Sequence, residues 1–154
     1  MRDFNDADRA KKRRRITLPE NPGNLPPDAL ARLEAAVRQA ASGGHLSCPR
    51  GWRVARDMGV SRLDVGAMAD RLGIRITDCQ LGCFKVDKTP YDPGGAEPPS
   101  EEVVRRVREL HERGELTCAN VFELARELDL RPRTVADAAN AGGYKLRQCQ
   151  LGCF

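Results

Sequence analysis

The sequence has no hydrophobic run that approaches a membrane span, which needs about 20 apolar residues. Its first residues are polar and charged, so we expect no signal peptide and a cytoplasmic protein. It also lacks a P-loop and a GxGxxG motif, and neither of its two histidines is flanked by a nucleophile motif. These absences predict that the chain is neither a membrane protein nor an enzyme.

The 154 residues suit one ordinary domain or two small ones, and 40% hydrophobic with 31% charged residues is typical of a globular protein. The formal net charge is +4. Residues 1–16 hold seven Lys or Arg against three Asp, and the rest of the chain has 19 basic and 19 acidic residues. The positive charge therefore belongs to the N-terminal segment.

An internal repeat organises the rest of the chain. Residues 46–84 and 116–154 align at a constant offset of 70 without a gap, and thirteen positions are identical. Six of these identities form the block CQLGCF that ends each copy. A match of this kind indicates a duplication, with each copy preceded by an amphipathic helix.

The repeat sets the expected domain boundaries. Residues 1–24 are predicted to be a basic disordered tail, 25–84 a first module, 85–99 a linker with four prolines and two glycines, and 100–154 a second module. Modules of this size are marginal as single cores. Contact between the modules, dimerisation or a bound metal would each stabilise them.

Three positions in each copy follow the spacing of a helix-turn-helix. A small residue stands where two helices cross, a residue tolerant of positive φ follows four positions later, and an apolar residue stands six positions further on. These residues are Ala55, Gly59 and Val65 in the first copy and Ala125, Asp129 and Val135 in the second. The pattern resembles the helix-turn-helix of DNA-binding repressors. Residues 73–77 and 143–147 alternate apolar and polar, which predicts a short strand or wing.

We therefore expect a mainly α fold of two tandem, winged-helix-like modules. The resemblance implies DNA as the partner, and the second copy is the better candidate because its acidic residues precede its basic ones. The residues expected to contact DNA are Arg62, Arg71, Arg75, Arg131, Arg133, Thr134, Lys145 and Arg147, with the N-terminal run Lys11, Lys12, Arg13, Arg14 and Arg15.

Each copy also holds three cysteines at matching positions. They are Cys48, Cys79 and Cys83 in the first copy and Cys118, Cys149 and Cys153 in the second. Three thiolates suit an iron–sulfur cluster with one iron left to another ligand, or zinc with a fourth ligand. Buried structural thiols and a redox dithiol are the alternatives that the residues leave open.

Two functions remain after these considerations. The first is a DNA-binding transcriptional regulator that responds to a metal or an iron–sulfur cluster through its cysteines. The second is a metal-binding or protein-interaction accessory factor for a metalloenzyme, which uses the helix-turn-helix as a scaffold. The balanced charge of the two modules favours the second function, whereas the helix-turn-helix spacing favours the first.

Overall fold

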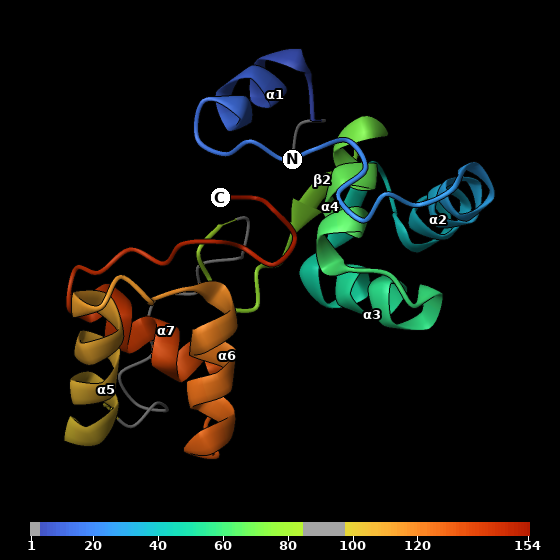
Figure 1. Cartoon of the computed structure of the whole chain (residues 1–154). Coiled ribbons are helices and arrows are strands. Elements are labelled where there is room, and N and C mark those ends of the chain that lie inside the picture. The colour runs from blue at the N-terminus through green and yellow to red at the C-terminus, as the bar shows by residue number, and fades with distance from the viewer. Residues whose placement is uncertain (1–3, 85–97) are drawn as a thin grey trace. The chain divides into compact units, whose positions relative to one another are not determined.

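The computed structural model describes residues 4–84 and 98–154, and within them the chain is mainly helical (Figure 1). The described residues form seven helices and one parallel sheet of two strands. They divide into two compact units: unit 1 contains the chain as far as Cys79 together with Gln150–Phe154, and unit 2 contains Gln80–Cys149. No helix in this described part of the chain has the length and apolar character needed to cross a bilayer.

Unit 1 contains the first copy of the repeat as far as Cys79 and the segment before it. Its elements are α1 (Asp6–Arg13), α2 (Pro27–Ala40), β1 (His45–Ser47), α3 (Cys48–Met58), α4 (Arg62–Arg71) and β2 (Arg75–Thr77). The strands β1 and β2 pair in parallel, with Leu46 opposite Ile76. The strand expected over 73–77 is therefore β2, and its partner is the short strand before α3.

The turn between α3 and α4 follows from its sequence. Gly59 ends α3 with a φ of 65°, and the Val60 N–H donates to the Ala55 carbonyl at 3.0 Å. This is the geometry of a glycine-terminated helix. Ser61 and Asp64 then form a capping box that starts α4. Together, the end of α3 at Gly59 and the capping box of α4 determine the turn between these two helices.

Unit 2 repeats this arrangement. Its helices are α5 (Glu101–Glu112), α6 (Cys118–Glu127) and α7 (Pro132–Ala141). Asp129 takes the place of the glycine with a φ of 51°, and the Leu130 N–H donates to the Ala125 carbonyl at 2.8 Å. A single parallel bridge joins Thr117 to Arg147, at the positions that pair Ser47 with Thr77 in unit 1. The duplication in the sequence is thus a duplication of the local fold.

The units differ from the expected modules in one respect. The pentapeptide QLGCF at the end of the first copy, Gln80–Phe84, belongs to unit 2, and Gln150–Phe154 at the end of the second copy belongs to unit 1. The leucines of these pentapeptides, Leu81 and Leu151, are only 1% and 0% exposed. Of the linker expected over 85–99, residues 85–97 lie outside the described residues.

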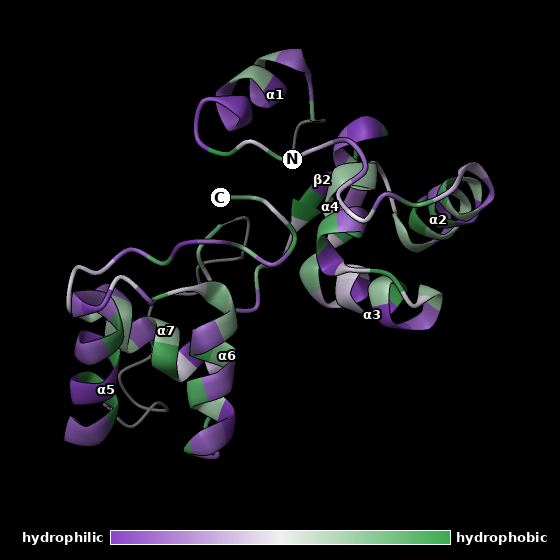
Figure 2. Cartoon of the chain, in the orientation of Figure 1, coloured by the Kyte–Doolittle hydropathy of each residue, from purple (hydrophilic) through white to green (hydrophobic). Residues whose placement is uncertain are grey.

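The N-terminal segment also differs from the expected disordered tail. Residues Asp6–Arg13 form α1, which begins at an Asn5 capping box. No residue of α1 is buried, and Figure 2 shows it as a largely hydrophilic helix. Two ion pairs attach it: Arg75 to Asp8 at 2.6 Å and Lys12 to Asp70 at 2.5 Å. Asp8, one of the acidic residues that offset the basic run in the sequence, is therefore a structural partner of Arg75.

Removal of the Asp8 carboxylate should destabilise unit 1. The side chains of Arg75 and Asp8 are only 7% and 12% exposed, and loss of one member of a buried pair costs about 3 kcal/mol. We expect D8A to lower the free energy of unfolding by about that amount in urea titrations. The control is D6A, since Asp6 is exposed in the same helical turn. Equal stability losses in D6A and D8A would contradict this role of the ion pair.

Candidate functional site

Each unit places two of its predicted cysteine ligands at one edge of its strand pair. In unit 1, Cys48 follows β1 directly and Cys79 comes two residues after β2, so both lie where parallel strands end together. Both side chains are buried, with 8% and 7% exposure. In unit 2 the Cys118 N–H donates to the Arg147 carbonyl at 2.9 Å, and Cys149 follows two residues later. Cys118 and Cys149 are buried in the same way.

The third cysteine of each copy lies on a QLGCF pentapeptide. Cys83 is exposed and Cys153 is half-buried. Through residues 4–84 and 98–154, no disulfide joins these cysteines, and no group of three or more His, Cys, Asp or Glu is arranged to hold a metal. The described arrangement therefore places two cysteines of each predicted set in one unit, where its paired strands end, and the third cysteine in the other unit.

The helix that would read DNA in unit 1, α4, is buried along most of its length. Residues 64–69 are all buried. A Cβ on Gly66 would collide with the backbone carbonyl of Leu151, which covers one side of the helix. On another side the Gly23 N–H donates to the Asp64 carboxylate at 2.6 Å. The chain itself thus occupies the surface that a DNA groove would need.

The predicted DNA contacts of unit 1 are mostly engaged within the protein. Arg75 is 6% exposed and is paired with Asp8. The Arg62 guanidinium lies 3.4 Å from the centre of the Trp52 ring and donates to the Gln150 side chain. Of the three predicted contacts within the first copy of the repeat, only Arg71, at the end of α4, is exposed. Burial of Arg75 corrects the expectation that it is presented to DNA.

The predicted DNA contacts of unit 2 are largely on its surface. Arg131 and Arg133 are exposed at the start of α7, where Thr134 is half-buried. The core-facing residues of this helix are Val135, Ala136, Ala138 and Ala139. Lys145 and Arg147 are also exposed, on the segment that the Thr117–Arg147 bridge attaches to the start of α6. The surface at the start of α7 is therefore basic, and a Cβ on Gly82 would meet the Arg133 side chain there.

The basic run near the N-terminus forms the last turn of α1 and the residues that follow it. Lys11, Arg13, Arg14 and Arg15 are exposed, whereas Lys12 is half-buried against Asp70. Four of its five cations are thus presented on a folded surface. This arrangement differs from the flexible arm that the sequence predicts.

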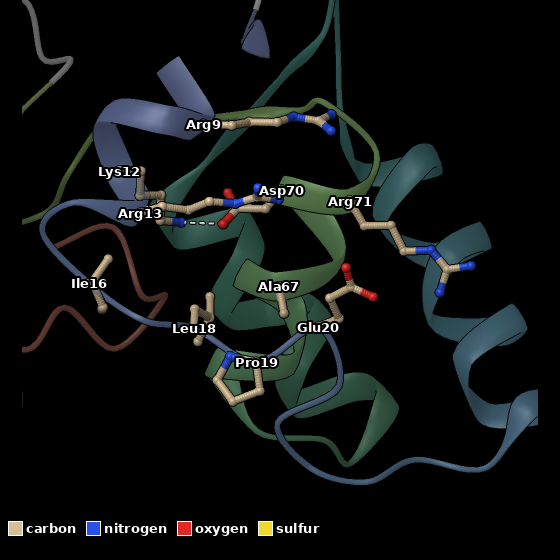
Figure 3. Close-up of a pocket in the computed structure, with 10 residues that line it drawn as sticks. All are labelled: Arg9, Lys12, Arg13, Ile16, Leu18, Pro19, Glu20, Ala67, Asp70 and Arg71. Carbon is tan, nitrogen blue, oxygen red and sulfur yellow. Dashed lines mark hydrogen bonds and ion pairs between the residues drawn. The ribbon is translucent and has the colours of Figure 1, made fainter. Parts of the chain in front are cut away.

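A pocket opens in unit 1 between α1, the segment 16–20 and α4 (Figure 3). Its apolar lining residues are Ile16, Leu18, Pro19 and Ala67, and its charged ones are Arg9, Lys12, Arg13, Glu20, Asp70 and Arg71. In Figure 3 the Lys12 side chain reaches Asp70 beside the apolar residues. Burial raises the pKa of Asp70, because desolvation outweighs the opposing effect of the Lys12 hydrogen bond.

Acidification should stabilise the wild type relative to a variant that cannot bind a proton at position 70. Since its pKa is raised by folding, the folded protein binds this proton more strongly than the unfolded chain. The unfolding free energy of the wild type minus that of D70N should therefore become more positive as the pH falls from neutral toward the usual pKa of 3.8. Urea titrations at several pH values measure this difference. D57N, at an exposed aspartate of α3, is the control. If the wild-type value minus the D70N value becomes more negative on acidification, the raised pKa of Asp70 is contradicted.

No protein-family model, curated protein or solved structure matches this chain.

Proposed function

We propose that this chain is a DNA-binding regulator in which unit 2 reads DNA through α6, α7 and the turn at Asp129. The observation that carries the proposal is a contrast in charge between the starts of α4 and α7. At the repeat offset of 70, the start of α7 exposes Arg131 and Arg133, where the start of α4 exposes Ser61 and Leu63. Unit 1 then acts as the partner that supports the reading unit.

The chemistry of this surface suits a DNA duplex. Arginine donates two parallel hydrogen bonds to guanine in the major groove, and lysine and arginine neutralise phosphates. Arg133 is paired with Asp137 at 2.8 Å, but both side chains are more than 40% exposed. An exposed pair of this kind contributes little free energy, so a phosphate can displace Asp137. Lys145 and Arg147 extend the basic surface beyond the helix.

The cysteines of unit 2 give this surface a means of regulation. Cys118 is the first residue of α6, and its N–H holds the Arg147 carbonyl. A zinc ion or an iron–sulfur cluster that takes Cys118 and Cys149 as two of its three or four protein ligands would fasten the segment that carries Lys145 and Arg147 to the start of α6. Loss of the metal would release those two cations from their position beside α7. Metal binding and DNA affinity would therefore be coupled.

Two arginines provide the test of DNA binding. Fluorescence anisotropy with a labelled random-sequence duplex should show binding that weakens as salt rises. R131S/R133S should weaken binding by about tenfold or more and reduce the slope of log K against log salt by about 2, one for each lost phosphate contact. The matched control is R105S/R108S, which removes two exposed arginines from α5. Equal losses in both double variants, or salt-independent binding, would overturn the proposed surface.

Metal content provides a separate test. We expect anaerobically purified protein to contain zinc or iron by elemental analysis, and C118S/C149S to contain less metal and to bind the duplex more weakly. A119S introduces the same side chain at the exposed neighbour of Cys118 and should keep both properties. A folded wild-type protein without metal would refute the regulatory part of the proposal while leaving the DNA contacts testable.

A further inference from the structure

The QLGCF pentapeptides have a relationship that the proposed function does not explain. Each one lies in the unit formed by the other copy of the repeat. The leucine in each is almost fully buried, Leu81 in unit 2 and Leu151 in unit 1. Such burial is typical of core residues rather than of a loose chain end.

The groove that receives Leu151 in unit 1 is shaped by two glycines. A Cβ on Gly51 would lie 3.3 Å from both terminal carbons of the Leu151 side chain. A Cβ on Gly66 would collide with the Leu151 carbonyl. The backbone of the pentapeptide therefore lies directly on α4, and this approach requires glycine at position 66.

The glycine of each pentapeptide meets the same position of the opposite repeat. Gly152 has a φ of 65°, and a Cβ on it would lie 2.8 Å from Leu18 and 3.4 Å from Leu63 at the start of α4. Gly82 has a φ of 71°, and a Cβ on it would collide with the Arg133 side chain at the start of α7. Leu63 and Arg133 are equivalent at the repeat offset of 70. The two pentapeptide glycines thus meet equivalent positions, although Val121 and Ala136 stand in unit 2 where unit 1 has Gly51 and Gly66.

We propose that QLGCF is a docking segment, and that each copy of the repeat is the receptor for the segment of the other copy. The two copies are then held together by a reciprocal exchange and stay associated when the chain between them is cut. Each receptor requires a buried leucine followed by a glycine with positive φ. This requirement gives a physical reason for the identity of the pentapeptides in copies that have otherwise diverged.

The exchange strengthens association because it is bivalent. When one pentapeptide is docked, the other is held near its own groove, and its binding becomes an intramolecular event. Two modest interactions therefore combine into one much stronger association. This is the reason to expect that a covalent connection between the copies is dispensable after folding.

A cleavable chain tests the proposal directly. A specific protease site is placed within residues 85–97, and the full chain is folded before it is cut. We expect the two fragments to elute together in size-exclusion chromatography at micromolar concentration and to give the mass of the intact 17.0 kDa chain in native mass spectrometry. Fragments that elute separately while each remains folded would overturn the proposal.

Two glycine-to-alanine variants separate docking from general stability. In the cut protein, G66A should weaken fragment association by about tenfold or more, because the new Cβ expels Leu151 from α4. G43A is the matched control, since a Cβ on Gly43 meets nothing within 4 Å. It should leave association unchanged, although its φ of 55° makes alanine unfavourable there. Equal association in G66A and the wild type would contradict the docking geometry.

The second receptor provides an independent variant. L81A removes the buried leucine from the pentapeptide in unit 2 and leaves the groove of unit 1 unchanged. We expect it to weaken association of the cut fragments while the circular dichroism of the uncut chain stays that of a helical protein. If G66A fails to fold, L81A still decides the matter: unchanged association would refute the reciprocal exchange.

Discussion

The core of each unit is completed by a leucine that the opposite copy of the repeat supplies. Leu151 fills the space between Gly51 and Gly66, and Leu81 is buried in unit 2 to the same degree. A single copy of this repeat is near the lower limit of size for a stable core. An exchanged leucine adds apolar burial to each unit and makes each depend on the other copy.

The same contact decides which surfaces face outward. Leu151 covers one side of α4, and the Gly23 N–H donates to Asp64 on another side. This helix therefore has little surface left for a partner. Arg62 is likewise held by Trp52 and Gln150. The exposed cations at the start of α7 therefore give the duplicated units different surfaces, although their folds are equivalent. After such a duplication, one copy can stabilise the fold while the other copy binds a partner.

Local sequence patterns predicted much of the fold. Capping residues, apolar stripes and the residues tolerant of positive φ at 59 and 129 specify where helices start and end, and the structure has helices and turns there. Long-range features were harder to predict. The ion pairs that hold α1 join residues 58 and 67 positions apart, so the charges near the N-terminus looked like a solvated tail. The exchange was also hard to predict, because the two pentapeptides are identical and their sequence does not say which copy of the repeat each one contacts. Of the predicted site residues, sequence alone did not distinguish the buried Arg75 from the exposed Arg147.

The place of Gln150–Phe154 in unit 1 has a consequence for biosynthesis. The ribosome makes nearly all of unit 1 first, yet the segment that covers Gly66 emerges only after the whole of unit 2. Domains usually fold in order as they are synthesised. Here unit 1 cannot complete its fold until Gln150–Phe154 has been synthesised, and until then one side of α4 is uncovered. Contacts between residues so distant in sequence also form slowly. During that interval the positions that Leu151 later covers, at Gly51 and Gly66, lack that cover.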